Sequence, residues 1–407
     1  MDILFVSRRY HPHVGGVETQ MRIVAHELAS RHCVEVATLQ QDHGSHFDGS
    51  IAVHSLKLST LDRWRNTMLR LLPKRYRTSW FGYLLYRSIY LPKLRPLVRG
   101  KHVVHALKAE FLTQVAEEAA RAEGVSFVIT PYFHPQDIPR AAARLHAELV
   151  FCKRAQIVFA LLETDRQMLI DLGVERERVR LAGVMPLLPE TSDPEGFRAR
   201  HGLGKKPVVL FLGRLEAYKG WKSIYAAAPL VWQDELDAHF IFAGPASEAV
   251  QNRFAEQPDE RLRYLGRIDE QEKGDALAAC DLFCMPSIAE ILPAVYLEAW
   301  SYGKPVVGGT AHGLQELIEG NEAGITIEQN AQILAARLVE LLRDEPRRRQ
   351  MGENGRKLIM RRFTKEALVC AFDEAYEALR RPRTAEPLKV SEPDGSRAQA
   401  VSGSWSG

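Results

Sequence analysis

The sequence of 407 residues predicts an α/β protein with two doubly wound, Rossmann-like parallel sheets that face a central cleft. The first observation is length, because 407 residues exceed what one ordinary hydrophobic core organises. The second is a rhythm of short apolar runs alternating with amphipathic segments of helical period. The third is that this rhythm restarts near residue 208, again with a glycine directly after the first apolar run. We therefore expect two domains of the same architecture.

The first domain is expected over residues 1–186. Its opening strand is followed by Gly15 and Gly16 and then by a helix, a unit in which glycines let the backbone approach a ligand closely. A Gly pair also serves in ordinary turns, so this signal depends on the rest of the chain. The expected strands are 3–6, 34–39, 51–56, 102–107, 125–130, 157–162 and 179–182, and the expected helices are 17–29, 141–152 and 163–174.

The second domain is expected over residues 187–364. Three prolines punctuate the segment that leads to residues 204–207, which we interpret as the linker. The expected strands are 208–212, 239–243, 262–265, 281–285, 305–309 and 324–327, and the expected helices begin at about 221, 269, 293, 331, 347 and 365. The last helix, about 365–380, is expected to pack back on the first domain. Residues 381–407 are rich in Pro, Ser, Gly and charge, which predicts a disordered tail.

Composition limits the classes of partner. The net charge of +3 is too small to indicate nucleic acid, and no apolar run approaches the roughly 18 residues of a membrane span. Five scattered cysteines match no metal-ligand spacing and are typical of reduced thiols. The N-terminal residues form an apolar run without a basic flank, so we expect a first strand and no signal peptide. These features predict a cytoplasmic location.

Residues 57–101 differ from the rest of the chain. They contain twelve Lys or Arg, seven aromatic residues and one acid, Asp62. Two groups fall on separate sides of the expected helix: the basic Arg63, Arg70, Lys74 and Arg77, and the apolar Met68, Leu71, Leu72 and Trp80. Basic residues with interfacial aromatics suit a helix on an anionic membrane surface, which would place the protein peripherally on the inner face of the membrane. A nucleic-acid patch and a solvated face remain open as alternatives.

The segment 287–300 carries two carboxylates at the start of an apolar helix. Pro293 is a favoured first helical residue, so Glu290 is expected on the preceding loop and Glu298 inside the helix. Between them lie the free N–H groups of Ala294 and Val295, where an anionic ligand is favoured. The buried strand before this loop places it at the carboxyl end of a sheet, where open α/β sheets bind ligands. The alternative is that Glu290 favours the helix dipole and Glu298 lies on a solvated face.

Several motifs occur in series along the second half. They are Gly213-Arg214 with Lys219-Gly220, Pro286-Ser287 before Glu290-x7-Glu298-Ala299, Gly303-Lys-Pro-Val-Val307, and His312-Gly313-x-x-Glu316. Together they resemble the signatures of family-4 retaining glycosyltransferases of the GT-B fold. The opening strand with Gly15-Gly16-Val-Glu18 also resembles the start of that family, so the resemblance covers about residues 1–380.

The resemblance implies an enzyme that moves a sugar from a nucleoside diphosphate sugar to a hydroxyl of a sugar, glycan, lipid or small-molecule acceptor. It implies that donor binding involves Gly15, Gly16, Arg214, Lys219, Glu290, Ile291, Leu292, Ala294, Val295 and Glu298, and that the catalytic residues are Arg214, Lys219, Glu290 and His134. An Arg fork and a Lys point charge suit the departing diphosphate and could replace a metal ion. The chain has no Asp-x-Asp pair, P-loop or HExxH, so neither a metal nor a cofactor is expected.

Some features depart from the family pattern or admit another explanation. Ile291 and its neighbours replace the more usual Gly-Phe-Gly, His134 also fits a satisfied structural histidine, and Glu316 also fits the dipole of its own helix. A covalent double displacement would need a carboxylate beneath the anomeric carbon, and no candidate is assigned in the first half of the chain. We therefore expect front-face attack. A phosphorylase or sugar-nucleotide epimerase on the same fold, or a non-catalytic, membrane-associated protein that binds nucleotide sugars, remains open.

Overall fold

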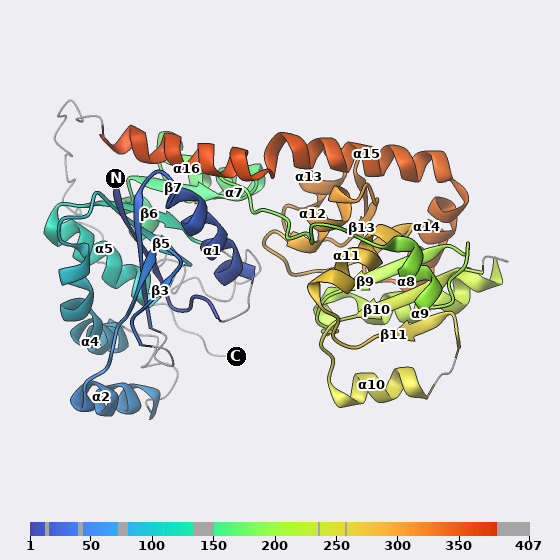
Figure 1. The fold of residues 1–407 in the computed structure, drawn as a ribbon, viewed down its shortest axis with the longest axis horizontal. Helices are drawn as coiled ribbons and strands as arrows, with labels where there is room; N and C mark the ends of the chain where they lie inside the picture. Colours follow the sequence, from blue (N-terminus) through green and yellow to red (C-terminus); the bar gives the residue numbers. More distant parts are fainter. Residues whose placement is uncertain are drawn as a thin grey trace, which may run out of the picture.

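The computed structural model describes residues 1–12, 16–39, 44–71, 80–108, 110–132, 150–234, 237–256 and 259–380. Within these residues the chain forms two α/β lobes joined along one side by the last helices (Figure 1). Most of the expected helix 141–152 and the whole tail 381–407 lie outside them. A search of the described helices found none with the length and apolarity needed to cross a membrane.

The first lobe is built on an eight-stranded sheet in the order β3-β4-β2-β1-β5-β6-β7-β8. Its strands are β1 (Asp2–Ser7), β2 (Cys33–Thr38), β3 (His46–Asp48), β4 (Ile51–Ser55), β5 (Val103–Leu107), β6 (Ser126–Thr130), β7 (Ile157–Ala160) and β8 (Val179–Leu181). All neighbours pair in parallel except β3 with β4. The strand order reverses between β1 and β5, which marks the topological switch point of this sheet. The edge strand β3 was not predicted, because three residues are too few to show a periodic pattern.

The second lobe repeats the plan with six parallel strands in the order β11-β10-β9-β12-β13-β14. These are β9 (Val208–Leu212), β10 (His239–Ala243), β11 (Leu262–Tyr264), β12 (Leu282–Met285), β13 (Val306–Gly308) and β14 (Gly324–Thr326). The central strand β9 is buried along its whole length, as expected where helices cover both faces of a sheet. Its switch point lies between β9 and β12. The predicted fold class, two doubly wound parallel sheets, is confirmed.

Helices cover both sheets. In the first lobe they are α1 (Gly16–Leu28), α2 (Thr60–Leu71), α4 (Trp80–Val98), α5 (Phe111–Glu123) and α7 (Glu163–Asp171). In the second they are α8 (Pro194–Arg200), α9 (Trp221–Gln233), α10 (Glu248–Ala255), α11 (Glu270–Ala279), α12 (Ala294–Ser301), α13 (Leu314–Ile318) and α14 (Ala331–Arg343), and α15 (Glu345–Arg362) and α16 (Lys365–Arg380) close the described chain.

Helix α8 lies in the segment that was interpreted as a linker. Pro194 occupies the first turn, where its missing N–H costs nothing, and the Asp193 side chain caps the helix by accepting from Gly196 N at 2.8 Å. Phe197 is fully buried in the core of the second lobe. The prediction of a linker up to residues 204–207 is therefore wrong for α8, which belongs to the second lobe.

The basic stretch 57–101 divides into two helices with different surroundings. Helix α4 packs along α5, and its side chains Tyr83, Ile89, Tyr90, Leu94 and Val98 are buried in the core of the first lobe. The prediction that the whole stretch lies on a surface is therefore wrong for α4, because its aromatic residues pack inside. The large apolar side chains of this stretch that the structure describes as exposed all lie on α2.

The last helix returns to the first lobe after α15 has run along the second (Figure 1). Its side chains Leu368, Phe372 and Tyr376 pack in the same core as strand β1. A buried hydrogen-bonded chain fixes the helix, since His105 lies 2.7 Å from the Tyr376 hydroxyl and 2.9 Å from Thr130 Oγ1. Burial lowers the pKa of His105 to about 3, so the ring stays neutral and one nitrogen must accept.

We expect Tyr376→Phe to lower the free energy of unfolding by about 1–3 kcal/mol, because it removes one of the two partners of a buried imidazole. Urea denaturation measures the change. Tyr225→Phe is the matched control, since that hydroxyl donates to Arg253 O at 3.2 Å in an exposed position and should change stability by less than about 0.5 kcal/mol. Equal stability of the Tyr376 variant and the wild type would show that this contact does not hold α16.

Candidate active site

The loops after β9 and β12 meet at the switch point of the second sheet. The first carries Arg214 and, in the short helix η3 (Ala217–Lys219), Lys219; the second carries Glu290. Lys219 Nζ lies 2.6 Å from Glu290 Oε1, and both side chains are largely buried. The structure thus brings together two residues that the sequence placed 71 positions apart. A cation and a carboxylate so close to the strand ends form a polar centre in the place where such sheets bind ligands.

A shared backbone acceptor holds the two loops in register. The carbonyl of Tyr218, next to Lys219, accepts hydrogen bonds from Ile288 N at 2.9 Å, Ser287 Oγ at 3.2 Å and Gln329 Nε2 at 2.9 Å. Three donors from two other loops converge on this one oxygen. The position of the Lys219 side chain is therefore set by neighbouring loops as well as by its own.

Two further features tighten this packing. Gln329 also donates to Pro286 O at 2.8 Å, so its amide bridges the loops after β9 and β12. Gly220 has φ +81°, and a Cβ there would lie 2.6 Å from Pro286 O, so only glycine fits this close approach. Gln329 was not predicted from the sequence, although an amide side chain shortly after a strand end was an available signal.

Arg214 lies at the surface of the site. Its Nη2 donates to the Tyr218 hydroxyl at 2.9 Å, and it forms no ion pair with any residue that the structure describes. Glu290 compensates the charge of Lys219, whereas the charge of Arg214 stays uncompensated. The trio of Arg214, Lys219 and Glu290 therefore carries one net positive charge toward an anionic ligand.

Helix α12 begins at Ala294, one residue later than predicted, with Pro293 as its N-cap at φ −74° and ψ 108°. No side chain caps the helix, so the N–H groups of Ala294 and Val295 stay directed toward the preceding loop. The side chains of Ile291 and Leu292 pack on the core of the second lobe. Of these predicted donor-binding residues, Leu292 therefore offers its backbone to a ligand, whereas the side chain of Ile291 stays partly exposed.

Glu298 is buried inside the lobe, so its interpretation as part of a solvated face is wrong. Its Oε1 accepts hydrogen bonds from Lys273 Nζ at 3.0 Å and from Leu187 N, on the connection between the lobes, at 3.4 Å. Burial raises the pKa of this carboxyl, and the nearby Lys273 opposes the rise. Both of these bonds end on Oε1, and Oε2 accepts none from the described residues. One oxygen thus remains for a hydroxyl donor.

The first lobe contributes the helix that follows β1. Gly16 is the first residue of α1 and is exposed, and a Cβ added to it would meet nothing within 4 Å. No described residue therefore crowds the backbone at Gly16. Gly15 and His134, also predicted for the site, lie outside the described residues.

Two residues at strand ends of the first lobe were missed. Lys108 directly follows β5 with φ 69°, and Tyr132 lies just after β6 with φ 48°. Left-handed backbone at a non-glycine residue is strained and concentrates at functional sites. Lys108 Nζ lies 3.2 Å from Glu18 Oε1, on α1. These groups line the carboxyl edge of the first sheet. Their common position follows from the pairing of the strands and not from the sequence.

A carboxylate joins the two lobes on the side of the crossing helices. Glu316, on α13, accepts from Thr164 Oγ1 and from the N–H groups of Glu163 at 3.1 Å and Thr164 at 2.7 Å. It lies in the first turn of its own helix, as the alternative interpretation of the sequence had it, and it also caps the N-terminus of α7 in the other lobe. Gly313 fits there because a Cβ would lie 2.5 Å from Leu162 Cδ1.

Asp165 lies within this contact between the lobes. Burial, with Glu316 nearby, raises the pKa of its carboxyl from 3.8 to about 6, although the Leu162 N–H donates to it at 3.1 Å. His312 Nε2 is 3.8 Å from Asp165 Oδ1, and burial lowers the pKa of that imidazole. The contact thus contains a carboxyl that titrates near neutral pH.

Because the pKa of Asp165 is higher in the folded protein than 3.8, its contribution to stability is complete at low pH and is lost as the pH rises toward 6. We expect Asp165→Asn, which cannot ionise, to gain about 2 kcal/mol over the wild type between about pH 4.5 and pH 7.5. Urea denaturation at both pH values measures this difference. Asp171→Asn, on the same helix and exposed, is the control. A difference that does not change with pH would contradict the expectation.

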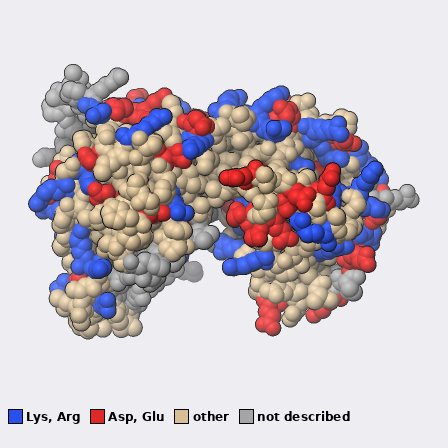
Figure 2. All heavy atoms as spheres, in the orientation of Figure 1, with Lys and Arg blue, Asp and Glu red and all other residues tan. Residues whose placement is uncertain are grey.

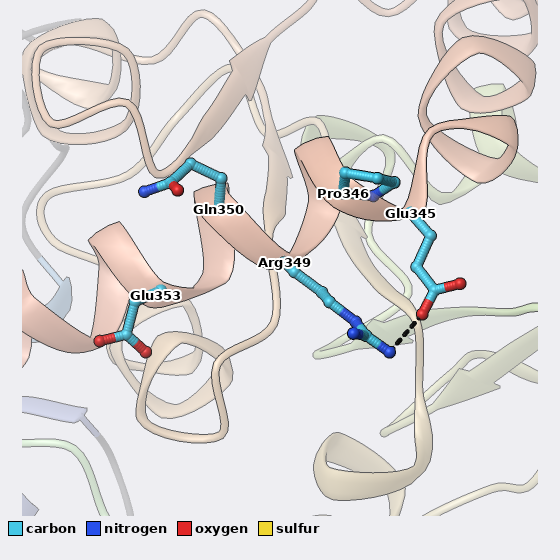
Figure 3. Close-up of a pocket in the computed structure, with 5 residues that line it drawn as sticks. All are labelled: Glu345, Pro346, Arg349, Gln350 and Glu353. Carbon is cyan, nitrogen blue, oxygen red and sulfur yellow. Dashed lines mark ion pairs between the residues drawn. The ribbon is translucent and has the colours of Figure 1, made fainter.

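Two other features were considered as sites. Among the described residues no group of His, Cys, Asp or Glu is arranged to hold a metal ion. A surface hollow of about 630 Å³ lies on α15, lined by Glu345, Pro346, Arg349, Gln350 and Glu353 (Figure 3). All five residues belong to one helix, and Arg349 is paired with Glu345 at 2.5 Å. The hollow does not include any strand-end loop, so we do not assign the site to it.

Both halves of the chain match known families. The family described as "Glycosyl transferases group 1" matches residues 194–358, and the family described as "Glycosyl transferase 4-like domain" matches residues 15–184. The two matches fall on the second and the first lobe, respectively.

Two relatives illustrate the similarity. A GDP-mannose-dependent monoacylated alpha-(1-6)-phosphatidylinositol monomannoside mannosyltransferase of Corynebacterium glutamicum is 34% identical over 181 residues, which are 42% of this chain and 47% of that protein. The match thus spans about half of that relative. An N-acetyl-alpha-D-glucosaminyl L-malate synthase of Bacillus anthracis is 30% identical over 301 residues, which are 64% of this chain and 76% of that protein.

A solved structure supports the fold. Sucrose-phosphate synthase from Thermosynechococcus elongatus superposes with a TM-score of 0.73 at 18% sequence identity, covering 93% of this chain and 98% of that one. At this identity the likeness concerns the fold alone.

Proposed function

The chain belongs to the group 1 glycosyltransferases, and from this premise we propose that it transfers a sugar from a nucleoside diphosphate sugar to an acceptor hydroxyl with retention of anomeric configuration. The observation that carries the proposal is the Lys219–Glu290 pair at the switch point of the second sheet. A diphosphate needs cationic and N–H donors, and a sugar needs carboxylate acceptors for its hydroxyls. The loops after β9 and β12 supply both.

In this proposal the second lobe, residues 187–364, binds the donor. Arg214 and Lys219 hold the diphosphate, with the uncapped N–H groups of Ala294 and Val295. Glu290 accepts from a hydroxyl of the transferred sugar. The remaining oxygen of Glu298 accepts from the ribose, a role that suits its fixed and buried position.

The reaction itself is proposed as attack on the front face. The acceptor oxygen bonds to the anomeric carbon on the face from which the diphosphate leaves. The bond from that carbon to the phosphate oxygen breaks, its electron pair stays on the diphosphate, and a diphosphate oxygen takes the proton of the acceptor hydroxyl. Arg214 and Lys219 stabilise the negative charge that develops, as donors in an oxyanion hole do.

The first lobe, residues 1–186, is proposed to bind the acceptor at the carboxyl edge of its sheet, near Lys108 and α1. Names of relatives do not fix the acceptor, since one names a phosphatidylinositol mannoside and another names malate. The lipid acceptor of the first relative, together with the exposed basic and apolar helix α2, supports a peripheral location at a membrane surface.

The first experiment identifies the donor. Thermal shift of the full chain against UDP-, GDP- and ADP-sugars should give one clear responder, because a ligand at a hundred times its Kd adds about 2.7 kcal/mol to stability. Lys219→Met should reduce that shift strongly, whereas Lys222→Met, an exposed lysine on α9, should leave it unchanged. A protein that no nucleotide sugar stabilises would contradict donor binding.

Once the donor is known, the turnover of an Arg214 variant tests the role of that positive charge. We expect Arg214→Ala to lower kcat by about 10²–10³, since the uncompensated guanidinium stabilises charge that appears in the transition state. The matched control is Arg349→Ala, an exposed arginine of α15, with kcat close to the wild type. Product analysis should find the transferred sugar on the acceptor.

Three results would contradict this assignment. A near-normal kcat for the Arg214 variant would remove that side chain from the reaction. An epimerised donor or a sugar phosphate as the main product would favour an epimerase or a phosphorylase. Donor binding without turnover across a panel of acceptors would favour a non-catalytic protein.

A further inference from the structure

Helix α2 carries four large apolar side chains that face solvent. Leu61, Trp64, Met68 and Leu71 are exposed to 56%, 61%, 40% and 71%. At 100° per residue these four positions fall within an arc of about 80° on one side of the helix. We call this surface the α2 face. A stripe of this kind on a folded lobe marks a surface made to contact something apolar.

The other side of α2 is anchored to the lobe. Asp62 is buried and accepts from Ser59 N at 3.1 Å and Ser59 Oγ at 2.7 Å, and Lys93 Nζ on α4 lies 2.8 Å from it. This single acid of the stretch 57–101 is thus turned inward and neutralised. No carboxylate of α2 is left beside the apolar stripe.

The described basic side chains of α2, and those from α4 to Lys101, fall into two classes. Those at and after α4 are compensated by carboxylates: Arg87 by Glu118, Lys93 by Asp62, Arg95 and Arg99 by Glu123, and Lys101 by Glu35. On α2, Arg63 and Arg65 form no ion pair with any described residue, and they flank the α2 face on opposite sides. Among these described side chains, the uncompensated positive charge therefore lies beside the exposed stripe, where Figure 2 shows blue and tan atoms.

We propose that the α2 face binds the surface of an anionic lipid bilayer. A helix with an apolar face and flanking arginines lies in the plane of the interface, with its apolar side chains among the acyl chains and its cations at the headgroups. This assignment deepens the peripheral location proposed above by naming the surface that makes the contact. It replaces the broader stretch 57–101 with a single helix.

Helix α2 lies on the side of the molecule where the two lobes open. Helices α15 and α16 cross between the lobes on one side of the molecule, and α2 lies at the opposite end of the first lobe (Figure 1). The surface is hollowed between the lobes below the crossing helices, toward the end of the molecule where α2 lies (Figure 2). Helix α2 and the opening between the lobes thus both lie away from the crossing helices α15 and α16.

Charge favours a bilayer over a second copy of the chain. A symmetric contact between two α2 faces would bring Arg63 and Arg65 of both copies together without a carboxylate between them. An anionic headgroup layer supplies the opposite charge.

The test is sedimentation of the full chain with phosphatidylcholine vesicles and with vesicles that contain about one third phosphatidylglycerol. We expect binding to the anionic vesicles that weakens with salt. Trp64→Ser with Leu71→Ser should lower partitioning at least about tenfold, because two exposed apolar groups no longer insert. Arg63→Glu with Arg65→Glu should lower it at least about twentyfold, since each surface cation contributes about fivefold. Met360→Ser, an equally exposed apolar residue on α15, is the control and should bind like the wild type.

These variants change exposed positions and the half-buried Arg65, all on α2 or α15 and outside the proposed donor site, so the thermal shift with the nucleotide donor should be the same as in the wild type. That readout separates the two proposals, because vesicle binding without any donor binding would overturn the proposed function and leave the α2 face intact. Wild-type affinity of both double variants for anionic vesicles would overturn the α2 face. A concentration-dependent dimer that Trp64→Ser dissociates would overturn it also, and would assign the face to a second copy.

Discussion

The ion pair between Lys219 and Glu290 is the contact around which the second lobe is arranged. Two largely buried charges are stable only when they compensate each other, so the loops after β9 and β12 must meet at 2.6 Å. The Tyr218 carbonyl, with its three donors, and the close approach at Gly220 hold that geometry. The same packing leaves Arg214 uncompensated at the surface. A polar centre of fixed shape and net positive charge results, which is what a nucleoside diphosphate sugar requires.

The two lobes are joined by a few polar contacts at their inner edge. Glu316 caps a helix of the other lobe, Arg362 Nη2 donates to Leu161 O at 2.8 Å, and Glu298 accepts from Leu187 N. Glu298 therefore belongs both to the proposed ribose site and to the connection between the lobes. A donor bound at this carboxylate would act on a group that also holds Leu187, and would in this way couple the site to the arrangement of the lobes.

Charge compensation explains why the two helices of one basic stretch have different surroundings. The cations at and after α4 meet carboxylates of neighbouring elements, chiefly Glu118 and Glu123 of α5, and become part of the packed lobe. Arg63 and Arg65 of α2 form no ion pair with the described residues, and the described apolar side chains of that helix remain exposed. Composition alone shows an excess of positive charge in both helices. The difference appears only when the neighbours in space are known.

The sequence by itself determined the fold class and the family, because buried parallel strands read as apolar runs and the motifs recur at fixed spacing. It also predicted Lys219, Glu290 and Glu298 as residues of the site. Only the tertiary structure decided that Lys219 and Glu290 pair, that Glu298 is buried against Lys273, and that Glu316 caps a helix of the other lobe. It also added Gln329 and Lys108. The physical reason is that these contacts join residues distant along the chain, and periodicity reports only which face of an element is buried, not what it meets there.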